Sequence, residues 1–408
     1  MCKDTKKNLV GQPIFSQIVK LLPRDKFQKL VNHYQSDRYY KTFFSWEHLV
    51  TMLYGVFSRC DSMGELCDSM RALGGNLNYL GLDRSPAKST AGDALRDRPN
   101  ELFRDFYLLL LEHFEPILSV SRIADVRFDK FYAFDSTTIS LFSQVMQGVG
   151  RNRKDDGKKK GGLKVHMLTD AHSDSAKFAK ISEAKRHDKN FLQDLVLPTS
   201  SMVVFDKAYN DYDQFAQWSQ KRVWFVTRMK KNAVRETQDV MFKRTLEKTE
   251  SGVCLDEHIH LFYKKKKIAK TLCLRKVDYR DEKGRDYQFL TNNWDITAEE
   301  VALLYKKRWS IELVFKKLKQ NFQLHFFWSD TENGIKSQVW ATLIAHLLIN
   351  VLKRKTKSDK AFSTIAALIR MHLPTHLDLT WLITESRRTY SKKRPRNKSP
   401  VTIQQELF

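Results

Sequence analysis

Several features that would place this chain in a familiar class are missing from its sequence. It has no uninterrupted run of about 18 apolar residues, the length a helix needs to span a bilayer. Its first residues, MCKDTKKNLV, lack the apolar core of a signal peptide. We therefore expect no membrane partner and a cytoplasmic location. Five cysteines form no CxxC pair, so neither a disulfide framework nor a zinc site is indicated.

Acidic residues are also scarce relative to basic ones. The 408 residues include 47 Asp and Glu against 71 Lys and Arg, which gives a net charge of +24 and a pI near 9.7. An excess of this size favours a polyanionic partner, with nucleic acid ahead of a membrane surface. The length suggests about two to four structural units, and 42% hydrophobic residues are enough for a buried core.

The first part of the chain is predicted to be helical. Four segments between residues 12 and 115 carry apolar residues at spacings of three and four, and they read PIFSQIVKLL, DKFQKLVNHY, WEHLVTMLYGVF and ELFRDFYLLLLEHF. The segment Ser85–Arg98 starts with residues that favour helix caps and then turns basic, which suits a small DNA-reading helix. A plain helical scaffold is the alternative, because no recognition helix stands out.

The pattern changes to strands at Arg127. RFDKFYAFDSTTISLF is aromatic, β-branched and alternating, so we predict a strand that ends near Asp135 with a polar turn beyond it. Two strands, a short helix over Asp188–Leu197, a buried strand ending at Asp206, a helix and a further strand follow. The loop RNRKDDGKKKGG suits phosphates. This order matches the front half of a ribonuclease-H-like α/β domain, in which the first and fourth strands lie side by side at the sheet centre.

The next stretch, residues 229–295, is predicted to be a β-rich insertion. It consists of short basic segments separated by turns at Ser251–Gly252 and Asp281–Gly284. Its charge run Lys264–Lys267 is either a solvated strand edge that prevents aggregation or a phosphate-binding surface. Further on, the segment Ile335–Lys353 is apolar on most sides and is expected to be a buried helix. The basic stretch SRRTYSKKRPRNKSP is expected to be a flexible tail.

Between these segments, YKKRWSIELVFKKLK is predicted to form one amphipathic helix. Four polar residues fall within roughly 60° of one outward face, namely Tyr305, Arg308, Glu312 and Lys319. The opposite side carries an apolar stripe that should dock on a core, formed by Ile311, Val314, Phe315 and Leu318. Trp309 is expected to pack this helix against its surroundings. A solvated face with ordinary pairing four residues apart is the alternative interpretation.

Three carboxylates are expected to meet, namely Asp135 and Asp206 at strand ends and Glu312 on the helix. They would repel one another unless cations intervene, so we predict a pair of Mg²⁺ ions, with Mn²⁺ as the alternative. Two such ions about 4 Å apart activate a nucleophile and stabilise the leaving oxygen of a phosphodiester. Each aspartate taken alone is more simply explained as a strand-end cap or turn residue, but this explanation is much weaker for three carboxylates in this order on these elements.

Three blocks of the chain resemble those of a known family. FYAFDSTTISL, VVFDKAYNDY and YKKRWSIELVFKKLK are similar to the catalytic blocks of bacterial insertion-sequence transposases of the DDE type, insertion-sequence family four. The Tyr-x2-Arg-x3-Glu-x6-Lys motif of that family is matched at all four positions of the predicted helix. The resemblance covers about residues 125–355, and the stretch from Phe15 to about Leu73 looks like a domain often attached to such enzymes.

The resemblance implies cut-and-paste DNA transposition. Hydrolysis frees a 3′-hydroxyl that forms a hairpin, the hairpin is opened by water, and the 3′-ends attack target DNA. By position, Asp135, Asp206 and Glu312 would bind the metals, and the remaining motif residues, Tyr305, Arg308 and Lys319, would hold a phosphate. The implied partners are double-stranded DNA, as terminal inverted repeats and as target, and a second copy in a homodimeric synaptic complex. The implied location is the nucleoid of a bacterial cytoplasm.

Further residues are assigned more loosely. Hairpin formation requires a flipped base on an aromatic ring, and relatives use a tryptophan before the strand that leads into a Leu-Thr pair. Tyr287 occupies that place here, and Trp294 is the alternative. Lys164 and His166 alternate onto one strand face and are outer-shell candidates, with an ordinary sheet-face role as the other interpretation.

The fold class expected is thus α/β, a ribonuclease-H-like catalytic domain whose mixed sheet is flanked by helices, with a β-rich insertion and an α-helical N-terminal domain. The expected units are a helical DNA-binding domain at 1–118, catalytic parts at 119–228 and 297–355, the insertion at 229–296, and a helical segment with basic tail at 356–408. Two other functions stay open from the residues alone: an inactive DNA-binding relic or inhibitor of transposition, and a structure-selective nuclease.

Overall fold

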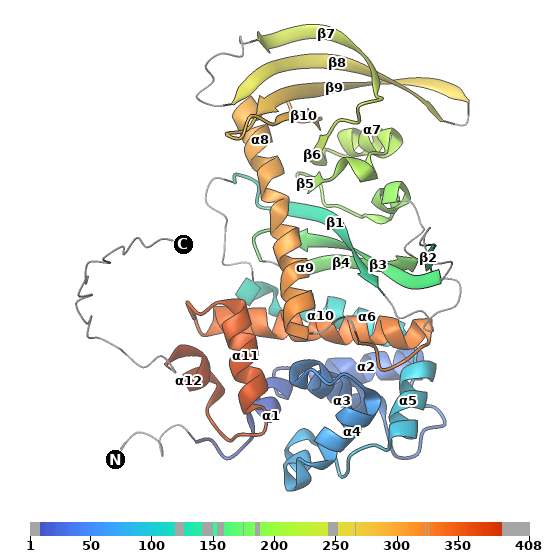
Figure 1. Ribbon diagram of the computed structural model, residues 1–408, viewed down its shortest axis with the longest axis vertical. Coiled ribbons are helices and arrows are strands. Elements are labelled where there is room, and N and C mark those ends of the chain that lie inside the picture. Colours follow the sequence, from blue (N-terminus) through green and yellow to red (C-terminus); the bar gives the residue numbers. More distant parts are fainter. Residues whose placement is uncertain are drawn as a thin grey trace, which may run out of the picture.

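The helices and strands follow the hydrophobic pattern of the sequence. The computed structural model describes residues 9–118, 126–140, 150–152, 159–173, 175–183, 188–243, 252–265, 267–322, 324 and 326–385. The basic stretch predicted to be a tail, residues 386–400, and residues 153–158 of the charged loop lie outside these ranges. Figure 1 shows two main parts, a twisted sheet above and a layer of helices below.

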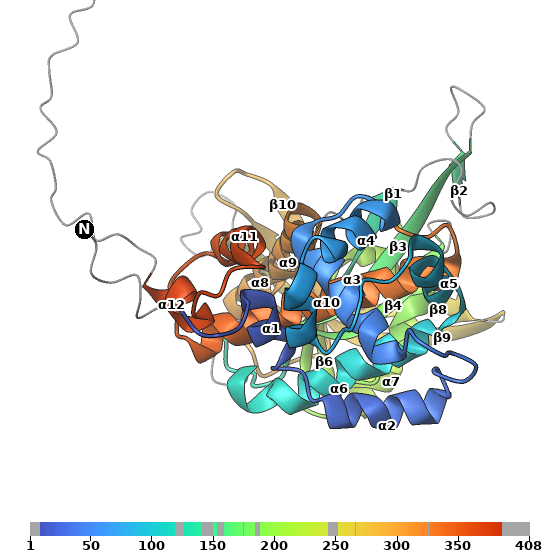
Figure 2. The same cartoon turned by 90° about the horizontal axis from the view of Figure 1, so that it is seen from below.

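The helical layer contains all four helices predicted for the first part of the chain. Its elements are α1 (Ile14–Val19), α2 (Arg24–Tyr34), α3 (Ser45–Ser58), α4 (Met63–Arg71), the 3₁₀ helix η2 (Gly74–Leu80), α5 (Lys88–Asp97) and α6 (Asn100–Leu118). Three C-terminal helices join the same layer: α10 (Glu332–Lys355), α11 (Phe362–His372) and α12 (Leu379–Thr384). Figure 2 shows α10 running through this layer between α3 and α6.

Helix α10 is the buried helix predicted from its apolar sequence. By length and composition it is the one helix in the described part of the chain that could cross a membrane, but 94% of its apolar window is buried inside the protein. It packs against α6 and α3 below and against β4 above. The apolar surface of α10 is therefore buried in the core between the helical layer and the sheet.

The sheet has ten strands, and its central pair is the one predicted. The strands are β1 (Phe131–Ser140), β2 (Gly150–Asn152), β3 (Lys159–Asp170), β4 (Ser175–Glu183), β5 (Met202–Phe205), β6 (Trp224–Arg228), β7 (Val234–Lys243), β8 (Val253–Lys265), β9 (Ile268–Arg280) and β10 (Asp286–Thr291). Their order is β2-β3-β1-β5-β6-β10-β9-β8-β7, with β4 paired to β3. Strands β1 and β5 lie side by side in parallel, as in a ribonuclease-H-like sheet.

Three local predictions need correction. Strand β1 does not end near Asp135 but continues to Ser140, because its antiparallel pairing with β3 persists after the pairing with β5 has stopped at Phe134. The helix expected at Asp188–Leu197 is a 3₁₀ helix, η3 (Asp188–Asp194). The insertion strands are not short, since β8 and β9 have 13 residues each, and they extend the central sheet through β10 and β6.

Alternation along the central strands divides the protein interior into two cores. On β1, Phe131 and Ala133 face the core shared with the helical layer, whereas Tyr132 and Phe134 face a second core. The second core is covered by η3 and by α7 (Tyr212–Gln220). Both faces of the sheet centre are therefore buried, and only the ends of its strands open to solvent.

A tryptophan fixes the N-terminal helices to the rest of the fold. Trp328, which precedes α10, is 9% exposed and donates its indole N–H to the carbonyl of Cys60 at 2.9 Å. Its ring packs so closely on α3 that a Cβ added to Gly55 would lie 2.6 Å from Trp328 Cη2. Glycine is required at this position because any side chain would displace the ring.

We predict that Gly55→Ala destabilises the protein by about 1–3 kcal/mol through overpacking. The matched control is Gly92→Ala in α5, where an added Cβ would meet nothing within 4 Å; it should be neutral or gain up to about 1 kcal/mol of helix propensity. Urea unfolding measures both variants. Equal stability of the two variants would contradict the close packing.

Candidate active site

The predicted central helix is in fact two helices that meet at Arg308. They are α8 (Ala298–Lys307) and α9 (Trp309–Phe322), and the backbone N–H of Arg308 bonds to the carbonyl of Tyr305 at 3.0 Å. This three-residue spacing tightens the turn and changes the phase of α9 relative to α8. Trp309, expected to pack the helix, is instead 57% exposed, because it lies on the side of α9 opposite the apolar stripe. The apolar stripe of α9 is buried as predicted, with Ile311 fully inaccessible.

The three predicted carboxylates come from three elements that meet at one edge of the sheet. Asp135 is the first residue of β1 beyond its pairing with β5, and Asp206 follows the last residue of β5. Because β1 and β5 are parallel, both aspartates lie at the same edge. Glu312 is in the first turn of α9, which packs against β1. Asp135 and Glu312 line a common cavity of about 490 Å³ together with Lys316 and Lys319.

Two arginines hold these carboxylates. Arg308 donates from Nη1 to Asp135 Oδ2 at 2.7 Å and from Nη2 to Glu312 Oε1 at 2.8 Å. Arg228, the last residue of β6, donates from Nη2 to Asp206 Oδ2 at 2.6 Å. Arg308 was predicted as part of an outward polar face, but it is only 7% exposed and lies between two of the carboxylates. Sequence analysis missed Arg228, although its position one strand away from Asp206 follows once β5 and β6 are paired.

The electrostatics of the two aspartates differ. Burial, together with repulsion from Asp206 and Glu312, raises the pKa of Asp135 to about 6 despite its bonds to the Ser136 N–H and Arg308. Burial also acts on Asp206, but the hydrogen bond from Arg228, the Ala208 N–H and the charge of Arg308 outweigh it and lower the pKa of Asp206. The two aspartates therefore differ because Asp206 has the stronger set of hydrogen bonds and positive neighbours, whereas burial dominates at Asp135.

The remaining motif residues lie next to this cluster. Tyr305 is 6% exposed rather than outward-facing, and its ring lies 5.8 Å from the guanidinium carbon of Arg228 and 5.7 Å from that of Arg308. Burial raises the pKa of Tyr305 to about 12, so its hydroxyl is a donor at neutral pH. Lys319 donates to the carbonyl of Thr138 on β1 at 3.0 Å. All members of the motif are thus gathered between β1, β5 and β6.

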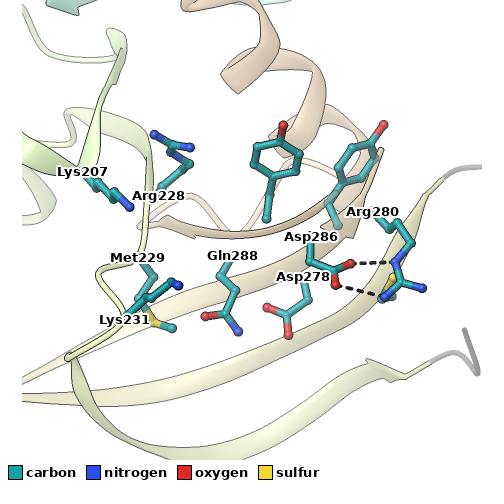
Figure 3. Close-up of a pocket in the computed structure, with 11 residues that line it drawn as sticks. Lys207, Arg228, Met229, Lys231, Asp278, Arg280, Asp286 and Gln288 are labelled. Carbon is teal, nitrogen blue, oxygen red and sulfur yellow. Dashed lines mark hydrogen bonds and ion pairs between the residues drawn. The ribbon is translucent and has the colours of Figure 1, made fainter. Parts of the chain in front are cut away.

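A second cavity, of about 430 Å³, opens on the other side of Arg228. Figure 3 shows it lined by Lys207, Arg228 and Lys231 and, from β9 and β10, by Asp278 and Gln288. Tyr287, one of the two candidate stacking residues, also lines it, and its ring stacks on Phe289 with centroids 5.9 Å apart. Cationic and aromatic groups therefore share one recess beside Asp206.

The other candidates lie elsewhere. Trp294 is 41% exposed and packs edge-on against His258 rather than in this cavity. His166 is fully buried, stacks on Phe191 with centroids 3.6 Å apart and bonds to the Tyr209 hydroxyl at 3.2 Å. It pairs in register with Ser136, so its side chain lies on the sheet face opposite to that of Asp135. Lys164 is half-buried on the same strand face. The outer-shell roles of Lys164 and His166 stay predictions.

Comparison with known proteins identifies the family of this chain. Residues 127–348, more than half of the 408-residue chain, match the family described as "Transposase DDE domain". The chain belongs to this family. The match spans all three carboxylates and the sheet that carries them, so the fold is the ribonuclease-H-like one predicted. Residues 10–83 match a separate family described as a domain of unknown function.

Two individual relatives whose names describe transposases are similar to this chain, and so is one solved structure. The chain is 26% identical to "Putative transposase y4zB" of Sinorhizobium fredii, over 66% of this chain and 72% of that protein. It is 28% identical to "Probable transposase for insertion sequence element IS5377" of Geobacillus stearothermophilus, over 60% of this chain and 63% of that protein. A solved structure, "Cryo-EM structure of piggyBac transposase synaptic complex with hairpin DNA", has a TM-score of 0.47 and 11% identity over 95% of this chain and 85% of that one.

DDE domains depend on divalent metal ions, and the donor set here fits such ions. The three carboxylates provide the hard oxygen ligands that Mg²⁺ prefers. Burial is the main cause of the raised pKa of Asp135, and the nearby carboxylates Asp206 and Glu312 add to it. Within the described ranges, however, no three acidic, His or Cys residues are already at metal-ligand spacing. Asp135, Asp206 and Glu312 are the residues that would hold such ions.

We predict that Asp135→Asn stabilises the metal-free, DNA-free protein at neutral pH. In the folded state this carboxyl has a pKa near 6, against about 3.9 when unfolded, so its ionisation costs folding free energy as pH rises from about 4 to 6. The gain should be on the order of 2 kcal/mol above pH 7 and disappear by about pH 4. Thermal unfolding in EDTA across this pH range measures it, with exposed Asp83→Asn as the control. A gain that is largest at low pH would contradict the assignment.

Proposed function

We propose that the protein is the transposase of an insertion sequence, and that it excises and inserts DNA by cut-and-paste transposition. The observation that carries the proposal is the convergence of Asp135, Asp206 and Glu312 at one sheet edge, beside two arginines, within a DDE domain. The net charge of +24 and relatives named as insertion-sequence transposases support a DNA substrate.

In this proposal each side chain has a defined task. Asp135, Asp206 and Glu312 would hold two Mg²⁺ ions, with Mn²⁺ as the possible substitute. Bound ions of this kind activate water or a 3′-hydroxyl and neutralise the leaving oxygen of a phosphodiester. The carboxylates would position the ions, and no side chain of the protein would then need to act as a general base. Their partial burial limits competing solvent and strengthens the electrostatic interactions around the reacting phosphate.

The motif cations position the DNA. Arg308 offers a planar fork suited to two phosphate oxygens, and Lys319 adds a point charge from the next turns of α9. The buried hydroxyl of Tyr305, which stays protonated at neutral pH, would donate a hydrogen bond to a phosphate oxygen. Together they would hold the phosphate at the transposon end in line with the nucleophile, which is the main catalytic requirement of such a displacement.

A hairpin route is part of the proposal. A hairpin bends DNA too tightly for every base to stay stacked, so one base must leave the helix. Tyr287 is favoured over Trp294 as the stacking residue, because it lines the 430 Å³ cavity beside Arg228 and Asp206. Two copies of the chain, each bound to one terminal inverted repeat, would form the synaptic complex that then joins the ends to target DNA.

We predict that Glu312→Gln abolishes DNA cleavage while leaving DNA binding intact. The loss should be at least about 100-fold, because removing a metal ligand exceeds the effect of removing its outer partners. The measurement uses a labelled duplex carrying the DNA that flanks the gene, with Mg²⁺, and resolves hairpin-ended from open products. Glu299→Gln, an exposed glutamate in the first turn of α8, is the matched control and should cut normally.

Hairpin-ended product from the native protein alone would support both the carboxylate triad and the hairpin route. Open ends without hairpins would support the triad and refute the route. If native and Glu312→Gln proteins bind but neither cuts, an inactive relic or inhibitor becomes the better account.

A further inference from the structure

The arginines at the triad bind each carboxylate through a single nitrogen. Arg308 and Arg228, here called the arginine pair, each give one terminal nitrogen per carboxylate, and the Nε of each is buried without a protein acceptor. Arg275 shows what a permanent pair looks like in the same sheet. It binds both oxygens of Asp256, at 2.9 and 2.6 Å, and its remaining terminal nitrogen donates to backbone carbonyls, so that every nitrogen of its guanidinium group has an acceptor.

We propose that the arginine pair is an exchangeable set of counter-cations that couples DNA binding to divalent-ion binding. Without DNA, the pair neutralises the three carboxylates and hinders entry of divalent ions. When DNA binds, its phosphates take over the guanidinium groups and the carboxylates are released to the ions. The inference rests on the proposed function, because it assigns DNA and divalent ions to this site.

The hydrogen bonds of the aspartates explain the hindrance. Asp135 accepts from the Ser136 N–H at one oxygen and from Arg308 at the other. Asp206 likewise accepts from the Ala208 N–H at one oxygen and from Arg228 at the other. Every carboxylate oxygen of the two aspartates therefore already faces a donor. A divalent ion that bound beside them would also be repelled by the adjacent guanidinium charges, strongly so at a partly buried site.

The surroundings allow the arginine pair to move. Arg308 lies in the turn between α8 and α9, and Glu312, one of its two partners, is 52% exposed in its side chain. Arg228 is 32% exposed and borders the 430 Å³ cavity. Both guanidinium groups lie near the ring of Tyr305, so one phosphate beside Tyr305 would attract both at once. Arginine binds phosphate with the fork geometry that a carboxylate otherwise uses.

Mn²⁺ binding, read from the electron paramagnetic resonance signal of the free ion, tests the coupling without relying on catalysis. The full chain is titrated alone and with a duplex that ends at the flanking repeat and lacks a 3′-hydroxyl, so that no strand transfer follows. A titration of the duplex alone gives the Mn²⁺ that the DNA binds, and this amount is subtracted. Binding that is lost in Asp206→Asn is binding at the triad. In the native protein the duplex should raise Mn²⁺ affinity at least about 5-fold, the lower end of typical coupling.

Variants of the arginine pair separate exchange from general charge effects. Arg228→Gln should raise the Mn²⁺ affinity of the DNA-free protein by about 10-fold, the equivalent of one ion pair of about 1.4 kcal/mol, and should reduce the effect of the duplex to less than about 2-fold. Arg280→Gln removes an arginine that lines the same cavity but binds Asp286, at 2.7 Å, and should change neither value (Figure 3). If Arg228→Gln melts abnormally, Arg308→Gln is used, with the same expected direction.

Equal Mn²⁺ affinity of the native protein with and without duplex would overturn the proposal. An undiminished effect of the duplex in both arginine variants would overturn it too, because coupling would then arise from charge alone. These failures differ from a failure of the proposed function: native protein that cuts DNA without coupling refutes only the exchange, and coupling without cutting refutes only the transposase activity.

Discussion

Three like charges at one partly buried sheet edge are the constraint on which this structure depends. Asp135, Asp206 and Glu312 are brought together by backbone pairing and helix packing, and their mutual repulsion needs cations to offset it. In the protein alone, Arg228 and Arg308 supply that charge. The pKa of Asp135 is nevertheless raised, chiefly by burial and further by the neighbouring carboxylates. A cluster of three carboxylates attracts cations, as the proposed two-ion phosphodiester chemistry requires.

The rest of the fold supports this edge. Parallel pairing of β1 with β5 places both aspartates at the same end of the sheet, and burial on both faces fixes the register. The turn between α8 and α9 directs Arg308 inward while Glu312 stays on the rim. Below, α10 and Trp328 bind the N-terminal helices to the catalytic sheet, so the 10–83 domain and the DDE domain share one core.

The parts of this arrangement that hydrophobic pattern specifies could be predicted. Apolar runs followed by an aspartate located the ends of the β1–β5 pairing, and the stripe through Ile311 and Leu318 located α9. Strand pairing could not be read in the same way. The sequence does not reveal Arg228 because its proximity to Asp206 depends on β5 pairing with β6. The strand β3 is predicted, but its pairing with β1, which carries β1 past Asp135 to Ser140, is set only in three dimensions.

The helix break at Arg308 was missed for a different reason. Every residue from Tyr305 to Lys319 is acceptable in a helix, so propensity gives no signal for a turn there. The break follows from tertiary packing, which draws Arg308 toward Asp135. Trp309 is at the surface and Tyr305 is in the core, both contrary to expectation. The exposure of Trp309 follows from its position opposite the apolar stripe of α9.

The most direct test of this account is the anomalous scattering of Mn²⁺ in crystals of the protein bound to its end DNA. The account predicts Mn²⁺ peaks within about 2–2.3 Å of the carboxylate oxygens of Asp135, Asp206 and Glu312, with both arginines of the pair turned to phosphate oxygens. Mn²⁺ peaks away from these carboxylates, with Arg308 still bound to Asp135 and Glu312, would contradict it.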